Sequence, residues 1–231
     1  MSEAKLTFIH TDRMDAFLSR ITPHIPFSYL WIYKKSLYGG KTVLDVGCGD
    51  GVLMSRIARG RDLEITGIDI FSKSLKAAKR KGVYSTLLKG DVVKKCEQLA
   101  RNRKKYDIVF CSQVIEHITR KDGINLLSLM DKLAEKKVVV ATPIGYMNQP
   151  EVFIGNNPYQ YHKSGWSVKE FVRRGYRVNG VGFRLGWSET GFSRGTNSLV
   201  VIISVMFSFL LSPLAYYFPN LAAGMMCIKN K

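Results

Sequence analysis

The sequence lacks the features that mark several classes of protein. Its cysteines form no C-x-x-C pair, since they lie at Cys48, Cys96, Cys111 and Cys227. A disulfide framework or a zinc ribbon is therefore not expected, and a reducing compartment suits the chain. The N-terminal residues include charged side chains and no apolar run, so we expect no secretory signal peptide. Internal repeats and low-complexity tracts are also absent.

Acidic residues are scarce relative to basic ones. The 231 residues include 35 Lys and Arg against 18 Asp and Glu, which gives a formal charge of +17. Much of the basic excess falls where expected helices end, as at Lys79–Lys81. A positive charge at that end interacts favourably with the helix dipole and stabilises the helix by about 0.3–1 kcal/mol. A nucleic-acid groove would combine basic and stacking aromatic side chains around the functional edge. That pattern is weak here, so nucleic acid is not the expected partner.

Charge of either sign is missing from Gly195 to Ile228, which also has no histidine. Residues 199–211 are almost uniformly apolar, and Ser212-Pro213 interrupts the run. A helix over residues 198–212 would be about 22 Å long at ~1.5 Å per residue, shorter than the ~30 Å hydrocarbon core of a bilayer. We therefore predict an apolar helical insertion at about 195–221 that enters the membrane surface through residues about 198–219. A lid packed on the protein and a dimer contact are the alternatives.

The remaining composition suits a packed domain, with 46% hydrophobic and 23% charged residues. Short runs rich in Val, Ile and aromatic residues alternate with segments typical of helices from residue 42 to about 186. The expected strands are Thr42–Val46, Leu63–Asp69, Val83–Leu88, Tyr106–Cys111, Lys137–Thr142 and Arg177–Leu185. The expected helices are Gly51–Arg59, Ser72–Lys81, Val92–Arg101, Gly123–Glu135 and Ser167–Arg174. This alternation predicts an α/β fold with a parallel, doubly wound sheet.

Residues 1–41 precede this pattern and are expected to form a helical preamble to a main domain over residues 42–231. They carry an aromatic patch formed by Phe27, Tyr29, Leu30, Trp31 and Tyr33. Packing against the edge of the sheet would explain the patch. A contribution to a substrate pocket is the alternative.

A glycine-rich loop joins the first expected strand to the first expected helix, with the sequence Asp45-Val46-Gly47-Cys48-Gly49-Asp50-Gly51. Glycine lets the backbone turn tightly and approach a ligand closely. A dinucleotide fingerprint would need glycine at position 52, which is Val52. A phosphate loop would need Gly-Lys followed by Ser or Thr, and this is absent.

Polar residues follow the next three strands as well, in Ile68-Asp69-Ile70, Gly90-Asp91-Val92 and Cys111-Ser112. Ligands of open α/β sheets bind at the carboxyl ends of the strands. Together with the glycine loop, these residues resemble class I S-adenosylmethionine-dependent methyltransferases, over roughly residues 40–186 and a final strand near Ala222–Lys229. The stretch Ser112-Gln113-Val114-Ile115-Glu116-His117 is similar to the group that acts on small molecules, quinones and lipids.

The resemblance implies a Rossmann-like sheet of seven strands, with the last antiparallel and inserted between the fifth and sixth. It implies S-adenosyl-L-methionine as cofactor, with Asp69 on the ribose, and Asp91 and the Val92 amide facing adenine. Gly47, Gly49, Gly51 and Ser112 would lie beside the methionine moiety. The implied cofactor-binding set is Asp45, Gly47, Cys48, Gly49, Gly51, Asp69, Ile70, Asp91, Val92 and Ser112.

Two histidines are candidates for a general base or for contact with the acceptor. His117 follows the fourth strand, and His162 lies in a loop rich in aromatic residues after the fifth. Some related methyltransferases hold a divalent metal with Glu-x-x-Glu-His at this place. Here the first position is Gln113, and a hard cation prefers several carboxylate oxygens, so no metal is expected.

The sequence therefore predicts a cytoplasmic methyltransferase, peripheral or monotopic at the membrane. We expect a hydrophobic or lipid-linked small-molecule acceptor, such as a quinone precursor, a phospholipid or a polyprenyl-linked compound. A soluble methyltransferase of RNA or protein is the alternative, since the net charge is high. A non-catalytic binding protein with the same fold is a second alternative.

Overall fold

The computed structural model describes residues 21–147, 157–184, 203 and 206–231. Most of the preamble (residues 1–20) and the first part of the apolar insertion (residues 195–202, 204 and 205) lie outside this part of the chain, and the predictions for them stay predictions.

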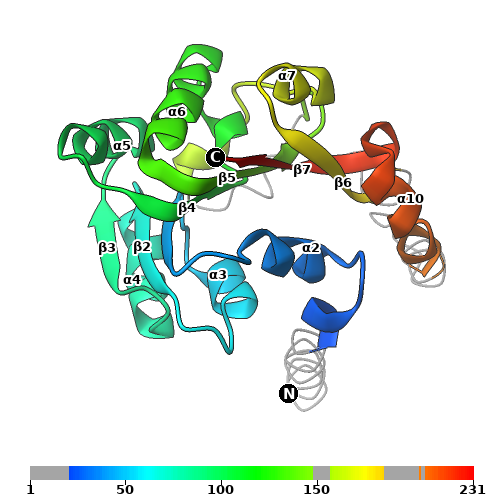
Figure 1. Cartoon of the computed structure of the whole chain (residues 1–231), viewed down its shortest axis with the longest axis horizontal. Coiled ribbons are helices and arrows are strands. Elements are labelled where there is room, and N and C mark those ends of the chain that lie inside the picture. Colours follow the sequence, from blue (N-terminus) through cyan, green and yellow to red (C-terminus); the bar gives the residue numbers. More distant parts are fainter. Residues whose placement is uncertain (1–20, 148–156, 185–202, 204–205) are drawn as a thin grey trace, which may run out of the picture.

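A single mixed sheet forms the centre of the molecule (Figure 1). Its strands are β1 (Thr42–Val46), β2 (Glu64–Asp69), β3 (Thr86–Lys89), β4 (Tyr106–Ser112), β5 (Ala134–Pro143), β6 (Arg177–Phe183) and β7 (Ala222–Asn230). The order is β3-β2-β1-β4-β5-β7-β6. Strand β7 is antiparallel to both neighbours, whereas β1 to β5 pair in parallel. The predicted seven-stranded Rossmann-like sheet, with the last strand between the fifth and sixth, is confirmed.

Helices cover both faces of the sheet, as expected for strands that are apolar on both sides. One core cluster contains residues of α5 (Val92–Arg101), α6 (Arg120–Leu133) and α7 (Val168–Arg173). The opposite cluster contains residues of α2 (Tyr29–Ser36), α3 (Val52–Ile57) and α10 (Ser212–Tyr217). Helix α4 (Ser72–Lys81) connects β2 to β3. The described residues also form short 3-10 turns at η1 (Thr22–His24), η2 (Ile115–His117), η4 (Pro158–Gln160) and η6 (Pro219–Leu221).

Local capping explains where the observed helices begin and end. Helices α4 and α5 have the predicted bounds, because Gly82 ends α4 in a left-handed conformation and Asp91 caps α5. Helix α6 begins three residues earlier than predicted, because the Thr119 side chain accepts a hydrogen bond from the Asp122 amide. Strand β3 begins later than predicted, at Thr86, so it pairs with only four residues of β2.

The end of the preamble packs against the end of the apolar insertion. Phe27 lies 5.4 Å from both Trp31 and Tyr216, measured between ring centroids. Helix α10 can approach the sheet closely because Gly180 of β6 has no side chain: a Cβ there would lie 2.1 Å from the Ala215 carbonyl oxygen. Among the described residues, no helix combines the length and the apolar character needed to cross a membrane.

Candidate functional site

The glycine loop turns sharply between β1 and α3. The amides of Gly47 and Cys48 both donate to the Ile68 carbonyl of β2, at 2.8 and 2.9 Å. The φ angles of Gly47, Gly49 and Gly51 are 78°, 55° and 76°, all in the region that favours glycine. A Cβ on Gly47 would lie 2.2 Å from the Val114 side chain, whereas a Cβ on Gly49 would meet no atom within 4 Å. The loop is thus packed on one side and open at Gly49.

Asp69 at the end of β2 is tied to this loop. Its Oδ2 accepts a hydrogen bond from the Gly49 amide at 2.8 Å, and its Oδ1 accepts one from the Phe71 amide at 2.7 Å. Burial raises the pKa of Asp69, and the two amides oppose that shift. Each carboxylate oxygen has two lone pairs, so both oxygens can accept a further hydrogen bond.

Asp45 and Asp91, the other aspartates of the predicted cofactor-binding set, have hydrogen-bond partners within the protein. Asp45 is buried and accepts a hydrogen bond from the Tyr84 hydroxyl at 2.7 Å. Burial raises the pKa of Asp45 to about 7, although the bond from Tyr84 opposes the shift. Asp91 caps α5, because its Oδ1 accepts from the amides of Val93 and Lys94. This leaves Oδ2 of Asp91 outside the cap.

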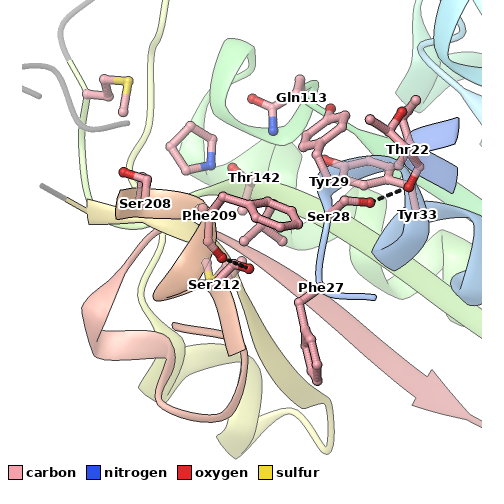
Figure 2. Close-up of a pocket in the computed structure, with 18 residues that line it drawn as sticks. Thr22, Phe27, Ser28, Tyr29, Tyr33, Gln113, Thr142, Ser208, Phe209 and Ser212 are labelled. Carbon is pink, nitrogen blue, oxygen red and sulfur yellow. Dashed lines mark hydrogen bonds between the residues drawn. The ribbon is translucent and has the colours of Figure 1, made fainter. Parts of the chain in front are cut away.

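A cavity of about 730 Å³ lies at the ends of β4 and β5 (Figure 2). Its wall comes from the start of α2, the ends of β4 and β5, the start of β7 and the segment before α10. The lining includes Tyr29, Tyr33, Gln113, Thr142, Phe209 and Ser212. The Ser112 hydroxyl lies 3.4 Å from the Tyr33 hydroxyl, so the end of β4 reaches the cavity wall. The predicted cofactor residues are not among those that line the cavity.

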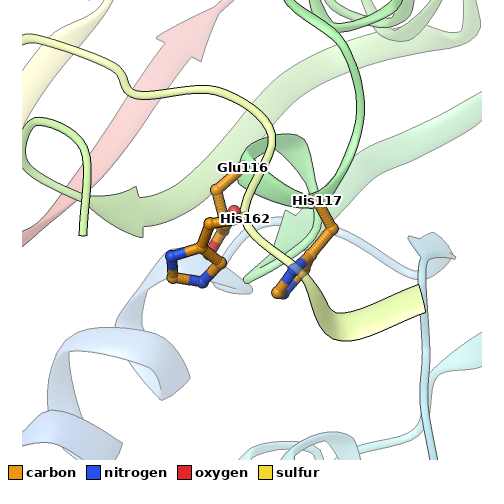
Figure 3. A group of neighbouring side chains, drawn as sticks. All are labelled: Glu116, His117 and His162. Carbon is orange, nitrogen blue, oxygen red and sulfur yellow. The ribbon is translucent and has the colours of Figure 1, made fainter. Parts of the chain in front are cut away.

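Three further side chains meet just after β4 (Figure 3). Glu116, His117 and His162 each offer a ligand atom, and these atoms lie within 4.8 Å of one another. Burial raises the pKa of Glu116 to about 7. Burial and the neighbouring His162 lower the pKa of His117 to about 4.

Backbone bonds bring His162 to this position. The amides of Lys163 and Ser164 both donate to the Glu116 carbonyl, at 2.7 and 3.1 Å. The Ser164 hydroxyl and the Trp166 indole donate to the Ile115 carbonyl. The loop after β5 is therefore fixed against η2.

Comparisons with known proteins agree with this geometry. A family model described as "Methyltransferase domain" matches residues 43–136. A solved SAM-dependent methyltransferase from Archaeoglobus fulgidus superposes with a TM-score of 0.56, covering 87% of this chain and 91% of that chain at 20% identity. TehB from Haemophilus influenzae superposes with a TM-score of 0.54 over 87% of this chain and 60% of that chain, at 12% identity. Residues 43–136 thus match a methyltransferase domain, and the sheet has the Rossmann-like fold of these solved proteins.

Curated relatives match the methyltransferase domain over part of their length. A ubiquinone biosynthesis O-methyltransferase of Bordetella avium (strain 197N) is 40% identical over 86 residues, which are 37% of this chain and 35% of that protein. A protein of the same name from Haemophilus ducreyi (strain 35000HP / ATCC 700724) is 28% identical over 139 residues, covering 52% of this chain and 58% of that protein. The chain thus spans less than two thirds of the length of these relatives.

The methyltransferase domain gathers the sequence-predicted residues at one edge of the sheet. The glycine loop with Cys48 follows β1, Asp69 and Ile70 end or follow β2, Asp91 and Val92 follow β3, and Ser112 ends β4. These strands are neighbours in the order β3-β2-β1-β4. Asp45 differs from the rest, because its carboxylate is buried against Tyr84.

Sequence reasoning missed part of the candidate site. It did not single out Thr142, which bonds Glu116 and also lines the cavity. It offered two roles for the aromatic patch before β1, packing against the sheet edge or a part in a substrate pocket, and both stay predictions. Tyr29 and Tyr33 line the cavity, whereas Trp31 packs with Phe27 and Tyr216.

Proposed function

We propose that the chain is an S-adenosylmethionine-dependent methyltransferase that acts on a hydrophobic small molecule at a membrane surface. The single observation that carries the proposal is a largely apolar cavity at the ends of β4 and β5, where β4 is the sheet neighbour of the strand that leads into the glycine loop. Apolar pockets with a few polar groups are typical of small-molecule sites.

The cofactor would lie over the open side of the glycine loop. Gly49 supports this placement, because a Cβ there would point into free space. Asp69 is already oriented by two amides and can accept hydrogen bonds from both ribose hydroxyls. Oδ2 of Asp91 and the amide of Val92 would face adenine, while Gly47, Gly51 and Ser112 would border the methionine moiety.

When bound, S-adenosylmethionine would supply a methyl group activated by its positively charged sulfur. The acceptor atom would bond to the methyl carbon in line as the carbon–sulfur bond breaks, and the sulfur would leave as a neutral thioether. The methyl group is already activated, so the main tasks of the protein are to align the acceptor and to exclude water. The aromatic side chains of Tyr29, Tyr33 and Phe209 in the cavity wall suit both tasks. The base or acceptor-contact role of His117 and His162 stays a prediction, since neither lines the cavity and a pKa near 4 makes His117 a weak base.

The acceptor class follows from the cavity and from the relatives. A wall rich in aromatic and aliphatic side chains favours a hydrophobic acceptor over a charged one. The relatives named for ubiquinone biosynthesis support an acceptor of the quinone-precursor kind. Phospholipids and polyprenyl-linked compounds share the same apolar character.

Membrane contact is proposed from the exposed side chains next to the cavity. Met206, Phe207, Leu210, Tyr217 and Phe218 have exposed fractions between 54% and 72%. Large apolar side chains gathered in this way are unusual on a surface that only water contacts. They adjoin Phe209 and Ser212 of the cavity wall, so an acceptor dissolved in lipid could enter directly.

A second candidate function, methylation of RNA or protein, is favoured only by the net charge of +17. A radiolabelled methyl-transfer assay separated into lipid, protein, RNA and small-molecule fractions distinguishes the two. Label in the lipid or small-molecule fraction supports our proposal. Label confined to RNA or protein overturns it.

Cofactor binding is tested by titrating S-adenosylmethionine into the parent and into Asp69→Ala by calorimetry. We expect Asp69→Ala to weaken binding about tenfold or more, because hydrogen bonds to a charged group contribute ~1.5–3 kcal/mol each. Asp62→Ala is the matched control, since Asp62 is exposed and precedes β2. Equal affinity in the parent and Asp69→Ala, or no binding by the parent, contradicts the proposal.

A further inference from the structure

A smaller pocket lies away from the proposed acceptor cavity. Its volume is about 250 Å³, and among the described residues it shares no lining side chain with that cavity. Its wall comes from α2, the first halves of β5 and β6, the second half of the antiparallel β7, and Tyr216 of α10. The pocket therefore belongs to the edge of the sheet opposite to the carboxyl ends of β4 and β5.

Positive charge is concentrated in the wall of this pocket, which we call the basic pocket. Lys35, Lys137 and Arg177 line it, and none of its described lining residues is acidic. The salt bridges within the described part of the chain involve other cations, so these three charges are not paired with a carboxylate. Burial lowers the pKa of Lys137, and the charges of Arg177 and Arg61 lower it further. A bound anion would relieve this repulsion.

The contacts of Lys137 explain its position and leave part of its binding capacity unused. Its Nζ donates to the Tyr38 carbonyl at 2.8 Å and to the Ser36 carbonyl at 3.2 Å, at the C-terminal end of α2. A cation stabilises that end of a helix. An ammonium group has three N–H donors, so one donor of Lys137 remains for a ligand. The guanidinium of Arg177 offers up to five more.

A buried acceptor lies in the same wall. The Nδ2 of Asn179 donates to the Tyr216 carbonyl at 3.4 Å, but its Oδ1 is buried and has no hydrogen-bond partner among the described residues. A buried polar atom without a partner is costly, which indicates that a ligand completes the site. A hydroxyl group on that ligand would supply the missing donor.

We propose that the basic pocket binds an organic phosphate that carries a hydroxyl group, either as a free small molecule or as the headgroup of a lipid. Arginine and lysine suit this ligand, because charge-assisted hydrogen bonds to phosphate oxygens are strong. The volume of the pocket lies just below the ~300–1,000 Å³ typical of sites for drug-sized ligands, which suits a group of this size. Binding here does not depend on methyl transfer, so its failure would leave the proposed function intact.

The test is a calorimetric titration of the full chain with glycerol 3-phosphate, and separately with inorganic phosphate and with glycerol, at constant ionic strength. We expect one site per chain, tighter binding of glycerol 3-phosphate than of inorganic phosphate, and no binding of glycerol. Arg177→Gln and Lys35→Gln should each weaken binding of glycerol 3-phosphate about tenfold or more, because each removes a charge-assisted hydrogen bond. Both side chains are exposed, so we expect both variants to fold.

Arg173→Gln is the matched control, because it removes the same charge from an exposed position on α7, which packs on the other face of the sheet. Absence of saturable binding of glycerol 3-phosphate, binding no tighter than that of inorganic phosphate, or an equal effect of Arg177→Gln and Arg173→Gln overturns the proposal.

Flotation with vesicles of phosphatidylcholine and phosphatidylglycerol then distinguishes the two sources of the phosphate, since the phosphatidylglycerol headgroup is a glycerol phosphate. A larger loss of flotation in Arg177→Gln than in Arg173→Gln supports a lipid headgroup as the ligand. Equal flotation of the two variants, together with the expected titration, supports a free organic phosphate.

Discussion

At the scale of single residues, the most informative group is the carboxylate of Asp45. It lies directly before the glycine loop, yet it is buried and accepts a hydrogen bond from the Tyr84 hydroxyl. Its pKa in the folded protein is about 7, against 3.8 for the free side chain. The folded state therefore binds more protons than the unfolded state between these two pH values, and ionisation of Asp45 lowers stability as the pH rises.

Asp45→Asn should remove this pH-dependent cost and retain the shape of the side chain. We expect the free energy of unfolding of the variant, relative to the parent, to rise by on the order of 2–3 kcal/mol between pH 5 and pH 7 and then to level off. Urea unfolding at a series of pH values, without cofactor, measures the difference. Asp62→Asn is the control, since Asp62 is exposed. A constant difference between Asp45→Asn and the parent across this range would contradict the assignment.

At the scale of secondary-structure elements, local signals were readable from the sequence and long-range ones were not. The bounds of α4 and α5 depend on Gly82 and Asp91, which act within one turn. The order of the sheet came from resemblance to a family. The cavity could not be predicted, because its wall joins Tyr29, Thr142 and Phe209 from distant parts of the chain. The same holds for His162, whose position depends on tertiary backbone bonds.

The contact between β6 and α10 is an element-scale feature that a single methyl group can test. In Gly180→Ala the new Cβ would lie 2.1 Å from the Ala215 carbonyl oxygen and 2.6 Å from the Ala222 Cβ. We expect a loss of ~1–3 kcal/mol from overpacking, and thus a melting temperature lower by roughly 2–10 °C. Calorimetric melting provides the measurement.

Gly224→Ala is the matched control for Gly180→Ala. Gly224 lies in the adjacent strand β7, and a Cβ there would come no closer than 3.5 Å to a neighbouring atom. Its melting temperature should stay near that of the parent. An equal decrease in both variants would mean that α10 does not depend on its close approach to Gly180.

At the scale of the whole molecule, charge and apolar surface are separated along the chain. The net charge of +17 belongs entirely to residues outside 195–228. Within that stretch, Leu210 and Phe218 expose 72% and 59% of their surface. Such a molecule can approach an anionic membrane through its charge and remain there through its apolar side chains. The two contributions differ in their response to salt, because only the first is screened.

Flotation with vesicles of phosphatidylcholine and phosphatidylglycerol in 0.5 M NaCl isolates the apolar contribution. Each of Leu210→Ser and Phe218→Ser should weaken binding by roughly tenfold, because burying one such side chain contributes ~1.5–3 kcal/mol. Val172→Ser is the control, since Val172 is 54% exposed on α7, away from the cavity. Deletion of residues 198–219 should abolish flotation at this salt concentration. A deletion variant that still floats with the vesicles would show that the membrane contact lies on another surface.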